Sequence, residues 1–170
     1  MLLSHRIRLL LVTAWVGSLW TVGYLVAPTL FMTLADRMLA GFIAGKLFRV
    51  EAWLSLMIGI CLLLMLYRER SRSPRTAGLA KLVVAMMACT LLGYFALQPS
   101  MASLREAAVG GVLQGDARSR FGLLHGIASA IYLLQSVLGI VLLMKHSAAL
   151  SASGNDAVKI DPRVPAEIVQ

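Results

Sequence analysis

Polar side chains recur along one face of an apolar stretch in the C-terminal part of the sequence. His125 is followed by Ser129, Tyr132 and Ser136 at helical spacing, and Gln135 lies beside this stripe. Inside an apolar segment, such side chains face protein or water rather than lipid. The pattern predicts either a path for a solute, a proton or a metal ion, or interhelical hydrogen bonds of about 1 kcal/mol each. Interhelical hydrogen bonding is the simpler of the two interpretations.

Glu51 is the one acidic residue expected within the margin of the bilayer. It stands four residues before Ser55, so both side chains lie on one face of a helix. A proton-coupled transporter needs such a carboxylate. A salt bridge to Arg49, Lys46 or an arginine of the other connection is the alternative, and the position near the interface favours it. Glu51 and His125 are expected at corresponding ends of their helices, where a carboxylate–imidazole pair is geometrically feasible.

The sequence contains too few suitable ligand residues to indicate a metal or haem site. Zinc and copper usually take three or four ligands, and His5 and His146 lie at the ends of apolar stretches, leaving His125 alone inside one. Cys61 and Cys89 are interpreted as small buried hydrophobes. No serine or cysteine has an assignable histidine and acid beside it. We therefore expect a protein that is not an enzyme and that has no cofactor.

The composition indicates which elements position these residues. Of 170 residues, 59% are hydrophobic and 14% are charged, whereas about 25% of a soluble protein is charged. The net charge of +8 concentrates at the ends of apolar stretches, which is typical of membrane topology and not of a nucleic-acid-binding surface. Because the hydrocarbon core takes about 20 helical residues, we expect an all-α, four-helix transmembrane bundle. The helices are expected at residues 9–27, 48–67, 81–98 and 121–144.

The distribution of positive charge predicts the topology. Ten of the 16 Lys and Arg residues lie before the first helix, between the second and third helices, or after the fourth. Since cytoplasmic loops carry the excess of Lys and Arg, both termini are expected in the cytoplasm. Residues 1–146 are expected to form the membrane domain, and residues 147–170 a mobile cytoplasmic tail.

The two outer connections contain amphipathic patterns. After Pro28 and after Pro99, apolar residues recur at near-helical spacing, which predicts segments along the membrane surface or over the bundle. Each proline is expected to kink or interrupt its helix. Gly23-Tyr24 precedes the first proline and Gly93-Tyr94 the second, which suggests two helix pairs related as a parallel repeat.

Small residues four positions apart are expected where helices approach one another closely. They are Ala14 and Ser18, Gly41 and Gly45, Ser55 and Gly59, and Gly122 and Gly126. Some of them are needed to close the bundle, and others are available for a dimer face. Tryptophan and tyrosine side chains are expected near helix ends or facing lipid, with no ligand role. They are Trp15, Trp20, Trp53 and Tyr67.

Three short motifs carry a resemblance to a known family. They are Tyr24-x-x-x-Pro28-x-x-Phe31, the stretch Ala40-Gly41 with Lys46-Leu47-Phe48, and Phe121-x-x-x-His125-Gly126. Over residues 9–144 the chain resembles the transmembrane protein 205-like family, a group of small four-helix membrane proteins of unknown function. The resemblance implies a four-helix inner-membrane protein if the source is bacterial. It implies no established reaction.

These observations predict a multi-pass protein of the bacterial inner membrane that acts as an interaction or membrane-integrity component. A small transporter or metal-handling protein that uses Glu51 and His125 is the alternative. A redox membrane subunit is a weaker third interpretation. The expected partners are the lipid bilayer and a second copy of the chain or another membrane protein, with no nucleic acid.

Overall fold

The computed structural model describes residues 2–69, 75–106 and 113–157. Within these residues the chain is all-α and contains no strand. Four helical columns of 31 or 33 residues are long and apolar enough to cross a membrane. The four-helix transmembrane fold predicted from the sequence is therefore confirmed.

The four columns are built from six α-helices and two π-helical segments within the described residues. They are α1 (Leu2–Trp20), a π-helical segment (Thr21–Val26), α2 (Ala27–Thr33), α3 (Arg37–Glu69), α4 (Arg75–Leu91), a second π-helical segment (Leu92–Leu97), α5 (Gln98–Glu106) and α6 (Gly115–Ala157).

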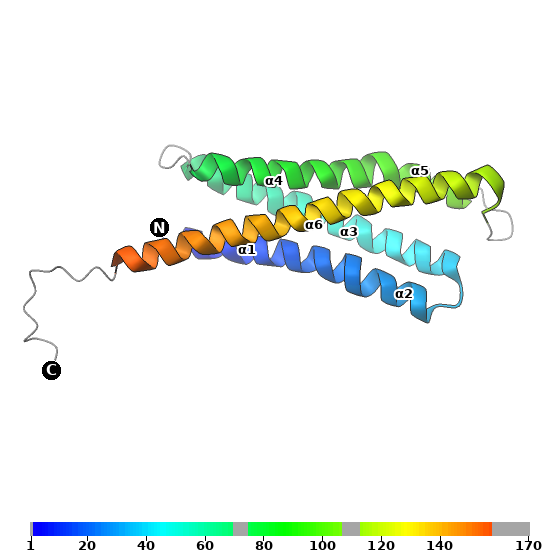
Figure 1. Ribbon diagram of the computed structural model, residues 1–170, viewed down its shortest axis with the longest axis horizontal. Helices are drawn as coiled ribbons and strands as arrows, with labels where there is room; N and C mark the ends of the chain where they lie inside the picture. Colours follow the sequence, from blue (N-terminus) through cyan, green and yellow to red (C-terminus); the bar gives the residue numbers. More distant parts are fainter. Residues whose placement is uncertain (1, 70–74, 107–112, 158–170) are drawn as a thin grey trace, which may run out of the picture.

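The columns form a four-cornered bundle in which neighbours run in opposite directions (Figure 1). α1 packs against α3 and α6, and α4 also packs against α3 and α6, so α1 and α4 occupy opposite corners. We call the end that holds the N-terminus the proximal end, and the end that holds α2, α5 and the starts of α3 and α6 the distal end. The second half of the chain has the same order of elements as the first half: a long helix, a π-helical segment, a short helix and a second long helix. This order agrees with the parallel repeat suggested by the sequence.

The helices continue through both prolines instead of ending there. Proline lacks an N–H and its ring clashes with the carbonyl four residues earlier, which an ordinary α-helical turn cannot accommodate. In this chain a π-helical segment precedes each proline, and Pro28 and Pro99 are the second residues of α2 and α5. The wider turn accommodates each ring, so the helical columns extend beyond the predicted ends at residues 27 and 98.

The outer connections also differ from the prediction. Leu34 adopts an extended conformation that ends α2, and Asp36 accepts hydrogen bonds from the backbone N–H groups of Met38 and Leu39. This N-terminal cap starts α3 at Arg37, eleven residues before the predicted start of the second helix. The predicted surface segments are therefore extensions of the spanning helices, since one continuous helix satisfies its own backbone groups.

Part of the predicted C-terminal tail is helical. α6 runs on from residue 147 to Ala157, and this part of the expected tail is helical. The remainder of the expected tail, residues 158–170, lies outside the described residues.

The proximal half of the bundle holds a continuous apolar core. Side chains from all four columns meet there with no solvent exposure or almost none. They are Val12, Trp15, Val16, Ile58, Leu62, Leu66, Val83, Met86 and Leu142. The distal half is packed differently, because a cavity occupies its centre.

Candidate functional site

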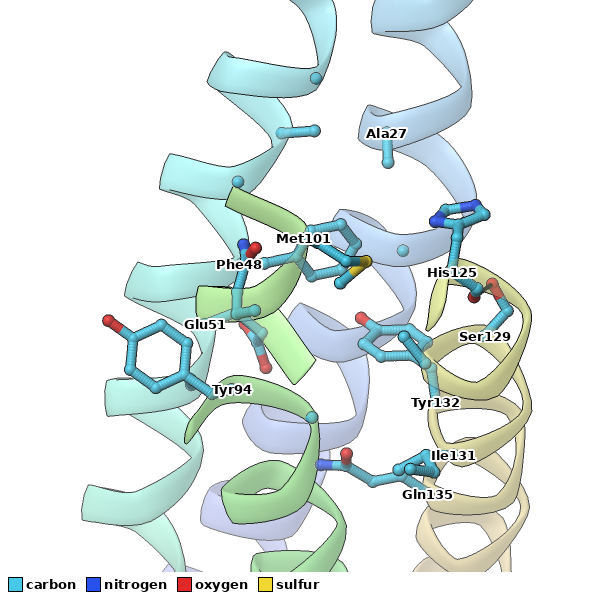
Figure 2. A pocket seen from close by; sticks show the side chains of 18 of the residues that line it. Ala27, Phe48, Glu51, Tyr94, Met101, His125, Ser129, Ile131, Tyr132 and Gln135 are labelled. Carbon is cyan, nitrogen blue, oxygen red and sulfur yellow. Dashed lines mark hydrogen bonds between the residues drawn. The ribbon is translucent and has the colours of Figure 1, made fainter. Parts of the chain in front are cut away.

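A cavity of about 850 Å³ lies in the distal half of the bundle. All four columns contribute to its mostly apolar lining. Figure 2 shows Glu51 and Phe48 on one side, Tyr132 and Gln135 on another, and Met101 between them. The volume falls within the range of about 300–1,000 Å³ that is typical of ligand pockets. Six of the seven polar residues predicted as a path or interhelical network line it: Glu51, Ser55, His125, Ser129, Tyr132 and Gln135.

Glu51 is buried in the cavity wall and forms no salt bridge with any residue that the structure describes. Its Oε1 accepts a hydrogen bond from Ser55 at 3.2 Å, and the Ser18 hydroxyl lies 3.3 Å away. The expected ion pair with Arg49 or Lys46 is therefore absent from the described residues. Glu51 faces the centre of the bundle, whereas those two side chains lie outside the cavity lining.

Trp15 is fully buried, which corrects the expectation that it lies near a helix end or faces lipid. Its indole N–H donates to Ser55 Oγ at 2.7 Å, and the same hydroxyl donates to Glu51. Trp20, Trp53 and Tyr67 are exposed, as predicted. A hydrogen-bonded chain of Trp15, Ser55 and Glu51 thus joins α1 to α3 at the deep end of the cavity.

The polar stripe of α6 divides into two parts. His125 and Ser129 are exposed: the His125 ring stacks on Phe121, and the Ser129 hydroxyl donates to the His125 carbonyl of its own helix. Tyr132 and Ser136 reach the first column, because Tyr132 donates to the Leu19 carbonyl and Ser136 accepts from Tyr24. Only the deeper part of the stripe is an interhelical network.

Gln135 completes this network on the opposite side. Its amide Nε2 donates to Thr90 Oγ1 at 2.9 Å, and both side chains are buried. This bond joins α6 to α4, while Tyr132 and Ser136 join α6 to the first column. Glu51 and His125 line the same cavity from opposite corners of the bundle, and no described hydrogen bond or ion pair joins them.

Arg105 is a cavity residue that sequence reasoning considered as a topological charge and, among the arginines of its connection, as a salt-bridge partner for Glu51. From α5 it donates to the Gly41 carbonyl at 2.7 Å and to Gln98 Oε1 at 3.1 Å. Its guanidinium carbon lies 5.8 Å from the centroid of the Phe121 ring. One signal for this residue was present, since Arg105 stands two helical turns after Gln98 on an amphipathic segment.

The small residues separate into packing and non-packing positions. A Cβ at Gly59 would lie 2.7 Å from Met87, and one at Gly45 would lie 3.3 Å from Gln98, so both glycines allow close approach. Gly41 lies against Arg105, and Ser18 bonds across to Glu51. In contrast, Ala14 is exposed, and a Cβ at either glycine of the α6 pair would meet no described atom within 4 Å. That pair is Gly122 and Gly126.

The polar residues do not form a path through the whole bundle. Below Ser55 and Gln135 the interior is the proximal apolar core, in which Leu62, Val83 and Leu142 have no exposed area. The cavity therefore extends from the distal end to the level of Thr90 and Ser55 and does not enter the proximal half.

A second polar cluster lies at the proximal end, outside the cavity. Arg8 pairs with Glu69 at 2.7 Å and donates to His5 Nδ1 at 3.0 Å. The rings of His5 and His146 lie 5.8 Å apart between centroids, although 141 residues separate them in the sequence. Sequence reasoning set these two histidines aside as helix-end residues and did not pair them. The cluster links α1, α3 and α6.

The donor set of the cavity suits hydrogen bonding and charge recognition. Within the described residues, no group of three or more His, Cys, Asp or Glu side chains is close enough to hold a metal ion. The cavity instead presents hydroxyl, amide, imidazole, guanidinium and carboxylate groups around apolar walls. Such a combination orients a small molecule by a few polar contacts and buries the rest of it.

Comparison with known proteins gives one match. Residues 10–109 match the family described as a domain of unknown function (DUF4149). The matched region covers more than half of the chain and ends before α6. No curated protein and no solved structure matches the chain.

Proposed function

The chain belongs to the DUF4149 family, and we propose that it is a non-enzymatic membrane protein that binds a small molecule in its distal cavity. The observation that carries this proposal is the cavity itself. Four helical columns line a partly open hollow of about 850 Å³, and polar side chains from three of them converge on it. A bundle that served only as a scaffold gains nothing from a hollow, because a void loses packing contacts.

This proposal keeps one part of the transporter interpretation, the binding of a small molecule, and leaves out its movement across the membrane. The apolar core closes the proximal half, so the cavity supports binding from one side of the membrane. Movement of a ligand across the membrane requires a second arrangement in which the proximal helices separate. The metal-handling form receives no support from the described side chains.

The finer family assignment is part of the same proposal. We infer that the chain is a bacterial member of the transmembrane protein 205-like family, on the motifs that carry that resemblance. Most positions of these motifs line the cavity, which supports a shared binding role. They are Tyr24, Pro28, Phe31, Gly41, Phe48, Phe121 and His125.

We also propose that the protein lies in the bacterial inner membrane with both termini in the cytoplasm, which makes the distal end outward-facing. The basis is the excess of Lys and Arg at the proximal side of the sequence. A green fluorescent protein fused after residue 170 is expected to fluoresce, and alkaline phosphatase at that place is expected to be inactive. Phosphatase inserted after Glu106 should be active. The reverse pattern of activities would show that the cavity faces the cytoplasm.

Filling the cavity is expected to expel its ligand. Ala128 lines the cavity, so a tryptophan there takes up ligand space. In native mass spectrometry of the full chain released from detergent, we expect the occupancy of a co-purified adduct to fall at least about tenfold in Ala128→Trp, which corresponds to about 1.4 kcal/mol.

Ala130→Trp is the matched control, because Ala130 is exposed on the same helix two residues away and does not line the cavity. It should retain the adduct. An adduct that persists equally in both variants, or a wild-type protein that carries only bilayer lipid removable by detergent exchange, contradicts a cavity ligand. The interaction or membrane-integrity role then becomes the better proposal, with the exposed Gly122 and Gly126 available to a second copy of the chain.

A further inference from the structure

Arg105 is held at the distal rim of the cavity by neutral groups only. Its three nitrogens donate to the Met101 carbonyl, the Gly41 carbonyl and Gln98 Oε1, at 3.3, 2.7 and 3.1 Å. The side chain is partly buried and lies over the Phe121 ring. These contacts fix the direction of the guanidinium group without neutralising its charge.

No acidic side chain among the described residues forms an ion pair with Arg105. Glu51 lines the same cavity but stands six residues beyond Gly45, where a Cβ would lie 3.7 Å from Arg105 Nη1, and six residues are about 9 Å of helix. The other ionisable groups that line the distal part are Arg37 and His125. Among the residues that line the cavity, the arginines therefore lie at the rim, and the one carboxylate lies below them.

The cavity changes from a charged rim to an apolar interior along its length. It follows α3 from Gly41 to Ser55, about 21 Å of helix, and its walls are mostly apolar. α3 is about 50 Å long and carries Arg37, Lys46 and Arg49 in its distal half, whereas residues 52–67 are uncharged. Since the hydrocarbon core is about 30 Å thick, the rim lies at the level of lipid headgroups and the deep end lies among acyl chains.

We propose that the cavity binds an acidic single-chain amphiphile, with its carboxylate or phosphate at Arg105 and its chain in the apolar interior. This inference rests on the proposed binding function and names its ligand class. A planar guanidinium group with a fixed direction recognises carboxylate and phosphate oxygens through charge-assisted hydrogen bonds. The polarity of the cavity runs in the same direction as that of such a molecule in the outer leaflet, so the ligand enters without inverting.

Headgroup selectivity of the wild-type protein tests this proposal. The full chain in phosphatidylcholine nanodiscs is titrated with a dansyl-labelled undecanoic acid, and the bound probe is displaced by four amphiphilic competitors and, separately, by inorganic phosphate. Dodecanoate, dodecyl phosphate, dodecanol and dodecyltrimethylammonium share one chain length and differ in headgroup. Hydrogen bonds to a charged group predict that the two acids displace the probe about 10–100-fold more strongly than dodecanol, and that the cation displaces it most weakly.

Variants assign the selectivity to one residue. Arg105→Gln is expected to abolish the preference for acids over dodecanol while retaining binding of the chain, and Arg105→Lys is expected to keep part of it. Arg118→Gln removes an equal charge from the distal end of α6, at an exposed position outside the cavity lining, and should change nothing. Displacement by dodecanoate and displacement by dodecanol are measured on the same protein sample and compared as a ratio. A loss of stability in Arg105→Gln would weaken both displacements and leave their ratio unchanged, so it cannot be mistaken for a loss of acid recognition.

Three outcomes overturn the inference in distinguishable ways. Equal displacement by dodecanol and dodecanoate leaves a binding cavity without acid recognition. Displacement by inorganic phosphate alone indicates a free anion as the ligand and not an amphiphile. Absence of saturable probe binding in the wild type, with no difference from Ala128→Trp, removes the proposed binding function itself.

Discussion

Trp15→Ala is expected to lower the melting temperature of the purified protein by roughly 6–20 °C. Trp15 has no exposed area and lies in the proximal core at the point where α1 meets α3. Removal of a buried tryptophan leaves a void and costs about 3–5 kcal/mol in a packed core. Loss of packing contacts is especially important here, because van der Waals packing drives the association of helices in lipid.

A second substitution at Trp15 separates the contribution of packing to stability from the contribution of the hydrogen bond. Trp15→Phe keeps most of the ring volume and removes the donor to Ser55, so it should cost about 0.5–1.5 kcal/mol. Trp53→Ala removes a tryptophan that is 54% exposed and should change the melting temperature little. Circular dichroism in one detergent measures all three variants. Equal effects of Trp15→Ala and Trp53→Ala would show that Trp15 faces lipid in the membrane.

Gly23→Ala is expected to disturb both the fold and the cavity. A Cβ at Gly23 would overlap Cε1 of Tyr132 and lie 2.7 Å from its Cζ, so the ring must move. The displaced ring loses its hydrogen bond to the Leu19 carbonyl and turns into the cavity that it lines. Overpacking of this kind costs about 1–3 kcal/mol, and ligand occupancy should fall with the loss of space.

Gly93→Ala is the matched control, because Gly93 occupies the corresponding π-helical segment of the second half. A Cβ there would meet nothing within 4 Å, and alanine is favoured over glycine in a helix by about 1 kcal/mol. We expect Gly93→Ala to leave the melting temperature unchanged or slightly higher. If both substitutions lowered it equally, the cause would be the π-helical backbone and not the contact with Tyr132.

The sequence was sufficient to predict the four helices. Charge-free stretches of about 20 residues identify spans on their own, and the spacing of Tyr132, Gln135 and Ser136 gave a common face of α6. The helix ends were less predictable. Prolines normally end helices, and here a π-helical segment accommodates each of them.

Contacts between distant segments could not be predicted from periodicity. In the sequence, Trp15 cannot be distinguished from a tryptophan at the membrane interface. The packing of α3 against α1 is what places Ser55 next to its indole N–H. Arg105 has the same signal as any charge near the end of a span, although it bonds to a carbonyl 64 residues away. The pairing of His5 with His146 likewise depends on the lateral arrangement of α1 and α6.

The π-helical segments also set the rotational phase of the helices beyond them. A π-helical turn places one extra residue in a column, and one residue corresponds to about 100° of rotation. Leu19 and Phe31 are twelve residues apart and both line the cavity. In an unbroken α-helix they would point about 120° apart, whereas with one residue looped out they diverge by about 20°. A chain shortened by one residue within Thr21–Val26 could form an unbroken α-helix and keep Phe31 toward the hollow, whereas the present chain needs the π-helical turn to do so.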